Sequence, residues 1–141
     1  MKKLLCVVLA TLSVTAHADK LGLDGDWAPM YRQKLGPADR DTGLYADLFY
    51  ETNSAMRTGD KVNIWVRANE LLVGGQRDVV ITHYAINCAT QRSAQIAVAR
   101  EEGDEVPHPE KLIDIKNPEY RSYGPSSPGM RVILFACKKI S

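Results

Sequence analysis

The sequence predicts an α+β fold: an antiparallel sheet of five or six strands with a C-terminal helix packed on one face and linked to it by a disulfide. Three observations favour this class. Apolar and polar residues alternate in several short segments, which is the period of strands. One segment near the C-terminus has apolar residues at helical spacing instead. Two cysteines, Cys88 and Cys137, lie in the strongest predicted strand and in that C-terminal segment.

The first half of the chain contains two alternating segments. Residues 19–41, which precede them, are rich in Gly, Pro and Asp and are predicted to be extended, with one short edge strand near Met30. Residues 44–50 alternate as a strand does, and residues 61–67 do so again after a glycine turn. The apolar face of the second segment consists of Val62, Ile64 and Val66.

The strongest predicted strand spans residues 78–88, because both of its faces are largely apolar, as in a central strand covered on both sides. One face carries Val80, Thr82, Tyr84, Ile86 and Cys88, and the other carries Val79, Ile81, His83 and Ala85. Residues 93–100 alternate again after a short gap, which predicts a hairpin. Their inward face is predicted to consist of Ala94, Ile96 and Val98.

Loops dominate the next part of the chain. Residues 101–110 are acidic and contain glycine and proline, so they are predicted to form a loop. Residues 111–115 are predicted to form a short strand. Residues 117–128 are rich in Pro, Ser and Gly, which indicates a second loop.

The C-terminal segment fits two structures. Ser127 and Pro128 suit the N-cap and first turn of a helix, and two lysines near the end suit the negative end of a helix dipole. Apolar residues recur at helical spacing at Met130, Ile133, Leu134 and Cys137. The apolar run 132–137 also fits a buried strand, but the capping signals favour the helix.

The N-terminus has the three zones of a cleavable signal peptide. Two lysines precede an apolar stretch of eleven residues, and a small-x-small cleavage pattern ends at Ala18. A short buried helix is the alternative. Eleven apolar residues are too few to cross a bilayer, which takes about 20 in a helix. We therefore expect residues 1–18 to be removed on export and residues 19–141 to form a single domain.

The exported chain is expected to be nearly neutral. Signal removal takes away two lysines and leaves 16 basic residues against 17 acidic ones, a formal net charge of −1. Such a balance gives no electrostatic reason to expect nucleic acid or anionic lipid as a partner. Since no second apolar run approaches membrane-spanning length, the sequence predicts a soluble protein that does not span a membrane. The signal peptide predicts its location, which is the periplasm or the cell surface.

Two cysteines remain after signal removal, Cys88 and Cys137. In an oxidising compartment a lone cysteine pair usually bonds, so we expect a disulfide between them. Closing this loop contributes about 4 kcal/mol in the chain-entropy model. Two free thiols or intermolecular bridges are the alternatives.

No segment has the pattern of a catalytic or metal site. His83 lies within a strand and His108 lies between two prolines, and no spacing resembles a zinc-ligand set. The double glycine at Gly74 lacks the lysine of a phosphate loop. The acidic pairs at Glu101 and Asp104 are typical of a solvated loop rather than of a two-carboxylate enzyme. The sequence thus predicts no enzyme activity, catalytic residue, metal or cofactor.

The aromatic residues are the candidate binding residues. Trp65 lies on the strand face opposite the apolar one, where it either covers a core beneath the C-terminal helix or forms an exposed anchor on a binding sheet. Tyr120, Arg121 and Tyr123 form a second group in a loop. Loops carry binding residues more often than the scaffold does. We therefore take these four residues as possible ligand-binding residues.

Several short motifs occur in an order typical of one known family. A strand with Tyr45 and Asp47 precedes all of them. They are Ser54-Ala55-Met56, Thr58-Gly59-Asp60-Lys61, Val62-Asn63-Ile64-Trp65-Val66, Tyr84-Ala85-Ile86-Asn87-Cys88, Arg92, Pro125-Ser126-Ser127 and Cys137-Lys138. In this order they resemble the surface-adhesin protein E-like family of small exported bacterial proteins, over roughly residues 44–138.

The resemblance implies a fold and an activity. The family's fold is an antiparallel sheet with a C-terminal helix linked back by a disulfide, which agrees with the prediction from periodicity. Its best-known activity is adhesion to host extracellular-matrix and plasma proteins, often as a dimer, so the resemblance implies a protein ligand and a homodimer. The binding residues of an adhesin need not match positions in this chain, so none is transferred.

Two functional hypotheses follow. The leading one is an exported, non-enzymatic binding protein, adhesin-like, with extracellular-matrix or other protein ligands. The alternative is a periplasmic housekeeping or inhibitor protein of unknown ligand.

Overall fold

The computed structural model describes residues 25–37 and 39–141. The predicted signal peptide, residues 1–18, lies outside the described residues, as do the first residues of the predicted domain.

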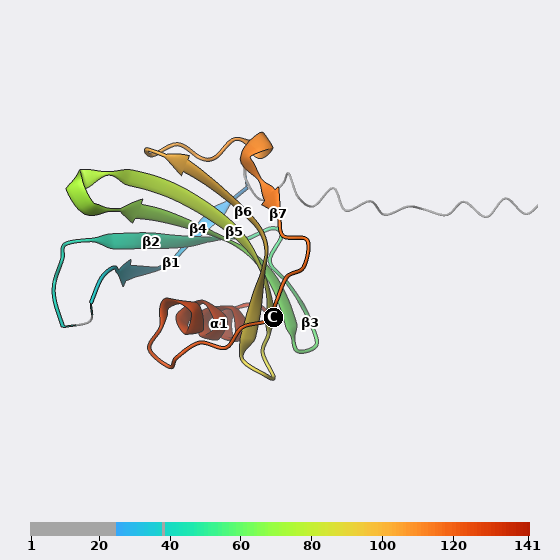
Figure 1. The fold of residues 1–141 in the computed structure, drawn as a ribbon. Coiled ribbons are helices and arrows are strands. Elements are labelled where there is room, and N and C mark those ends of the chain that lie inside the picture. Colours follow the sequence, from blue (N-terminus) through green and yellow to red (C-terminus); the bar gives the residue numbers. More distant parts are fainter. Residues whose placement is uncertain (1–24, 38) are drawn as a thin grey trace, which may run out of the picture.

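The described residues form one antiparallel sheet and a C-terminal helix (Figure 1). The strands lie in the order β1-β2-β4-β5-β6-β7, and β3 pairs only with β4. The elements are β1 (Trp27–Lys34), β2 (Tyr45–Glu51), β3 (Met56–Thr58), β4 (Lys61–Leu71), β5 (Arg77–Asn87), β6 (Arg92–Glu102), β7 (Ile113–Asp114) and α1 (Pro128–Lys139). The predicted α+β class is confirmed, with two short strands, β3 and β7, completing a seven-stranded sheet.

The predicted strands are present, and their lengths differ from the prediction at both edges of the sheet. The edge strand near Met30 is eight residues long and pairs with β2 along its whole length, with a register shift between Pro29 and Tyr31. At the other edge the strand predicted at 111–115 is only two residues long, because a 3₁₀ turn, Pro109–Lys111, occupies its first part.

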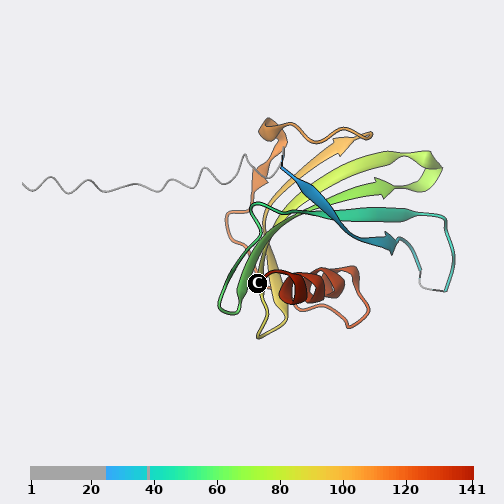
Figure 2. The ribbon, with the colours of Figure 1, turned by 180° about the vertical axis from the view of Figure 1, so that it is seen from behind.

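The helix α1 lies on the concave side of the bent sheet (Figures 1 and 2). Apolar residues from three strands and the helix form the core between them. They include Leu48 of β2, Val62, Ile64 and Val66 of β4, Ile86 of β5, and Val132, Ile133 and Ala136 of α1. Burying each large aliphatic side chain contributes roughly 1.5–3 kcal/mol. The β4 residues of this core, Val62, Ile64 and Val66, form the apolar strand face that alternation predicts.

A second core lies on the convex side of the sheet. It consists of Trp65, Val79, Ile81, Ala97 and Ala99, with Trp27, Val106 and Leu112 packed against it. The segment between β6 and β7 supplies the last two of these residues and so covers this face. Both faces of the central strands are therefore buried, as the two apolar faces of residues 78–88 predict.

Trp65 differs from both of its predicted placements. It is only 1% exposed, so it is not an exposed anchor, and it lies on the face of the sheet away from α1. Its ring stacks on His83, with centroids 4.5 Å apart and an interplanar angle of 8°. Alternation places it correctly opposite the apolar face of β4, but it does not reveal that a later loop covers that side.

The inward face of β6 also differs from the prediction. Ala94, Ala97 and Ala99 are buried, whereas Ile96 and Val98 are only half-buried. The cause is a register shift in the pairing of β5 with β6, where His83 faces Ala97 but Tyr84 faces Gln95. One extra residue in β6 reverses the alternation beyond it.

The C-terminal segment is a helix, as the capping signals predict. The side-chain oxygen of Ser127 accepts a hydrogen bond from the backbone N–H of Met130 (3.3 Å), and Pro128 occupies the first turn. Lys138 and Lys139 lie in the last turn, near the negative end of the helix dipole.

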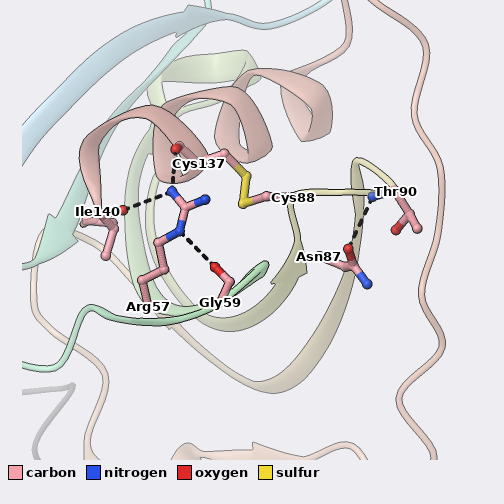
Figure 3. Close-up of a disulfide and its surroundings, with 7 residues drawn as sticks. All are labelled: Arg57, Gly59, Asn87, Cys88, Thr90, Cys137 and Ile140. Atoms are coloured by element: carbon pink, nitrogen blue, oxygen red, sulfur yellow. Dashed lines mark hydrogen bonds between the residues drawn. A yellow bond between two sulfur atoms is a disulfide. The ribbon is translucent and has the colours of Figure 1, made fainter.

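The far end of α1 is attached to the sheet by two interactions (Figure 3). Cys88, just beyond β5, forms the predicted disulfide with Cys137 in the helix. Arg57 of β3 donates from Nη1 to the backbone carbonyls of Cys137 (2.9 Å) and Ile140 (3.3 Å). A cation at this position satisfies carbonyls that the helix cannot satisfy itself and interacts favourably with its dipole.

A buried carboxylate organises the turn that follows β2. Glu51 is only 2% exposed, and its carboxylate accepts backbone hydrogen bonds from Asp26 (3.2 Å), Asn53 (3.0 Å) and Ser54 (2.6 Å). Burial alone would raise the pKa of Glu51, but hydrogen bonds to the carboxylate outweigh it and hold the pKa below its usual value.

Replacing Cys88 and Cys137 together by serine should lower the free energy of unfolding by about 4 kcal/mol, the chain-entropy value for a loop of this length. Urea unfolding of the parent and the double variant measures the difference, and the parent under reducing conditions is the matched control. Equal midpoints for the two proteins would show that the disulfide does not hold the helix in place.

Glu51→Gln should destabilise the protein at neutral pH by about 1–3 kcal/mol, because a charged hydrogen-bond acceptor is lost while its donors stay buried. Since the folded-state pKa is lowered, the stabilisation is fully present above the unfolded-state pKa of about 4.3 and is lost as the pH falls through the folded-state pKa. Urea midpoints of variant and parent should therefore begin to approach each other as the pH falls below the unfolded-state pKa and should meet below the lowered folded-state pKa. A pH-independent gap would contradict this role of the ionised carboxylate.

Candidate functional site

A short stretch of the outer edge of β6 has no strand beside it. On one side of the stretch, the backbone N–H of Ile115 donates to the carbonyl of Ile96 (2.8 Å). On the other side, Ser93 and Arg121 exchange two backbone hydrogen bonds (3.1 and 2.8 Å). Five residues, 116–120, thus connect points that only two residues of β6 separate, so this segment must arch away from the edge.

A pocket of about 510 Å³ lies under this arch, and we call it the edge slot. Two alternate residues of β6 line it, Ser93 and Gln95. Five alternate residues of the arch line it from the other side, namely Ile115, Asn117, Glu119, Arg121 and Tyr123. Every second residue from Ile115 to Tyr123 therefore faces the slot.

The slot belongs to the concave side of the sheet. Ser93 pairs with Ile86 and Gln95 pairs with Tyr84, and both partners pack in the core beneath α1. Burial raises the pKa of the Tyr84 hydroxyl, and hydrogen bonding to Gln95 partly opposes that effect. Gln95 thus lies beside Tyr84 of the concave core, and its own surface is exposed in the slot.

Tyr123 forms the wall of the slot nearest the helix. Its ring packs against Gly129 in the first turn of α1, so closely that a Cβ at position 129 would overlap the ring. Tyr123 is half-buried and packs against the core of the concave side. The glycine is therefore required for the close approach of the loop to the helix.

The charged residues of the slot are exposed and of both signs. Arg121 and Glu119 form no ion pair or side-chain hydrogen bond with any residue in the described part of the chain. Arg92, by contrast, donates from Nη2 to the backbone carbonyl of Tyr120 (2.7 Å) and so fixes the arch. The Tyr120 side chain is 38% exposed beside the slot.

The structure brings together part of the predicted set. Arg121 and Tyr123 line one pocket, and Tyr120 lies beside it. Trp65 is buried in the core of the convex side and does not line this pocket. Sequence reasoning missed the remaining slot residues, Ser93, Gln95, Ile115, Asn117 and Glu119. The signal that could have found the last three is the period of two from Ile115 to Tyr123, which the predicted loop assignment ignored.

Two other pockets are weaker candidates. One of about 110 Å³ lies near Arg77 and Asp104, which pair with each other (3.1 Å). Another of about 450 Å³ lies between the β1–β2 loop and the start of α1. In it Lys34 and Asp41 pair with each other (3.9 Å), and its wall includes residues on both sides of position 38, which lies outside the described residues.

In the described residues two carboxylates of the acidic loop are paired with cations. Glu101 is bound by Lys111 and Asp104 by Arg77, so each carboxylate faces a cation rather than another carboxylate. His108 is exposed, and His83 stacks on Trp65. Within residues 25–37 and 39–141 no three His, Cys, Asp or Glu side chains are grouped so that they could hold a metal ion.

The one helix in the described part of the chain, α1, is too short to cross a membrane.

No protein-family model, curated protein or solved structure matches this chain. The resemblance to the surface-adhesin protein E-like family therefore stays a prediction from short motifs.

Gly129→Ala should destabilise the protein by about 1–3 kcal/mol, because the added methyl group overpacks the site against Tyr123. In a Tyr123→Ala background the same change should instead stabilise by up to about 1 kcal/mol, since alanine is the better helix former. Urea unfolding of the four proteins of this double-mutant cycle measures both effects. The contact is refuted if Gly129→Ala has the same effect in both backgrounds.

Proposed function

We propose that this chain is an exported, non-enzymatic binding protein, located in the periplasm or at the cell surface, that binds a protein ligand through the arch from Ile115 to Tyr123. Its ligands are extracellular-matrix or other exposed proteins. The resemblance to the surface-adhesin protein E-like family supports the adhesin form of the proposal.

One observation carries the proposal: an exposed tyrosine and an exposed arginine lie side by side on a loop that is fixed to a sheet edge. Tyr120 and Arg121 are the residue types that dominate binding hot spots. Their backbone is held by the two hydrogen bonds of Arg121 to Ser93 and by the Arg92 bond to Tyr120. A loop held in this way loses little conformational freedom when a partner binds, which favours affinity.

The nearly neutral exported chain is consistent with a protein ligand rather than a polyanion. In the two smaller candidate pockets Lys34 pairs with Asp41 and Arg77 pairs with Asp104, whereas the charged groups of the arch have no partner among the described residues. Unpaired groups favour binding, because a partner can pair with them without first breaking contacts within the chain.

Tyr120→Ala should weaken binding to a matrix protein about tenfold or more, since truncating a hot-spot residue costs on the order of 2 kcal/mol. The purified protein is passed over immobilised extracellular-matrix proteins, such as collagen and fibronectin, on a sensor chip. Val73→Ala is the control, because Val73 is 78% exposed on the distant β4–β5 hairpin and should leave affinity unchanged.

Absence of saturable binding to every matrix protein tested would overturn the adhesin form of the proposal. Equal loss of affinity in the Tyr120 and Val73 variants would show that the arch is not the contact surface. Cell fractionation tests the location, because a protein found only in the periplasm never meets a host matrix.

A further inference from the structure

The edge slot differs from an open sheet edge because it is closed at both ends. The Ile115 bond to Ile96 closes one end, and the paired bonds of Ser93 and Arg121 close the other. An extended peptide that adds a strand to a sheet needs a continuous free edge. Here only two residues of β6 lie between the closures, so a passing strand cannot fit and a short molecule can.

The two charges of the slot lie close together in the chain. Glu119 and Arg121 are two residues apart and both line the slot, so at most about 7 Å of backbone separates them. Neither has an ion-pair partner in the described part of the chain. A complementary ligand therefore carries one positive and one negative group, separated by a similar distance.

Short peptides have this arrangement. The ammonium and carboxylate groups of a dipeptide are separated by up to about 7 Å of extended chain, whereas those of a free amino acid share one carbon atom. The slot volume of about 510 Å³ falls within the range of small-molecule sites. The amide side chain of Asn117 can donate and accept hydrogen bonds, as a peptide unit requires.

We propose that the edge slot binds a short zwitterionic peptide, with its carboxylate on Arg121 and its ammonium group on Glu119. Arginine binds a carboxylate through two parallel N–H donors, which gives both strength and orientation. The Glu119 carboxylate accepts hydrogen bonds from the ammonium group. This activity is separate from binding of a protein ligand by the arch and does not require it.

Alanyl-alanine is the probe, and isothermal titration calorimetry of the full protein is the measurement. Saturable binding of the free dipeptide is expected, with at least about tenfold weaker binding when its carboxyl end is amidated, when its amino end is acetylated, or when alanine itself is used. No saturable binding of the free dipeptide, or equal binding of all four compounds, overturns the proposal.

Variants assign each charge to its group. Arg121→Gln should bind the free and the amidated dipeptide equally, and Glu119→Gln should bind the free and the acetylated dipeptide equally. Lys116→Gln is the matched control: Lys116 is exposed on the same arch but does not line the slot, so affinity should not change. An Arg121→Gln protein that melts as the parent does but still prefers the free carboxylate overturns the assignment.

The outcomes separate this proposal from the protein-binding function. A protein that binds alanyl-alanine but no matrix protein retains the slot activity and lacks the adhesin function. A protein that binds matrix proteins but not alanyl-alanine retains the adhesin function alone.

Discussion

The position of α1 on the concave face is the constraint on which the rest of the structure depends, and different interactions hold its two ends. At the C-terminal end the disulfide to Cys88 and the Arg57 bonds fix the last turn to the strands. At the N-terminal end Gly129 lets the Tyr123 ring approach the first turn, and the Arg131 guanidinium lies over the Tyr31 ring, 4.2 Å from its centroid. Because Tyr123 is also a wall of the edge slot, the geometry of the slot depends on where the helix lies.

The chain between β6 and α1 has two structural roles that belong to opposite faces of the sheet. Its first part places Val106 and Leu112 over the convex core, against the buried Trp65. Its second part forms β7, arches past the β6 edge and reaches the helix through Tyr123. Covering the convex core thus determines where the arch begins, and packing against α1 determines where it ends. The space under the arch is a consequence of these two fixed points, since the segment between them is longer than the edge it spans.

Much of the fold could be predicted from the sequence, because alternation, capping and the cysteine pair all report on local or strongly constrained features. The N-cap at Ser127 and the period of β4 and β5 are of this kind. The register shift in β6 could not be predicted, since Ile96 and Ala97 are both apolar and either could point inward. The cover over Trp65 depends on a segment about forty residues later in the chain, which periodicity does not detect. The slot exists because the arch has five residues where the facing stretch of β6 has two, and only the three-dimensional pairing reveals that difference.

The closed ends of the slot limit pairing of the β6 edge with another chain and still leave space for a small ligand. An unpaired sheet edge exposes backbone groups that can pair with another chain and lead to aggregation. At the β1 edge the protein limits this with Pro29 and a bulge. At the β6 edge, β7 and the Arg121 bridge close the two ends of the stretch that lines the slot. Such a stretch is too short for strand addition yet wide enough for a small ligand. The same hydrogen bonds that protect the edge also hold the slot residues in place before a ligand arrives, which lowers the entropic cost of binding.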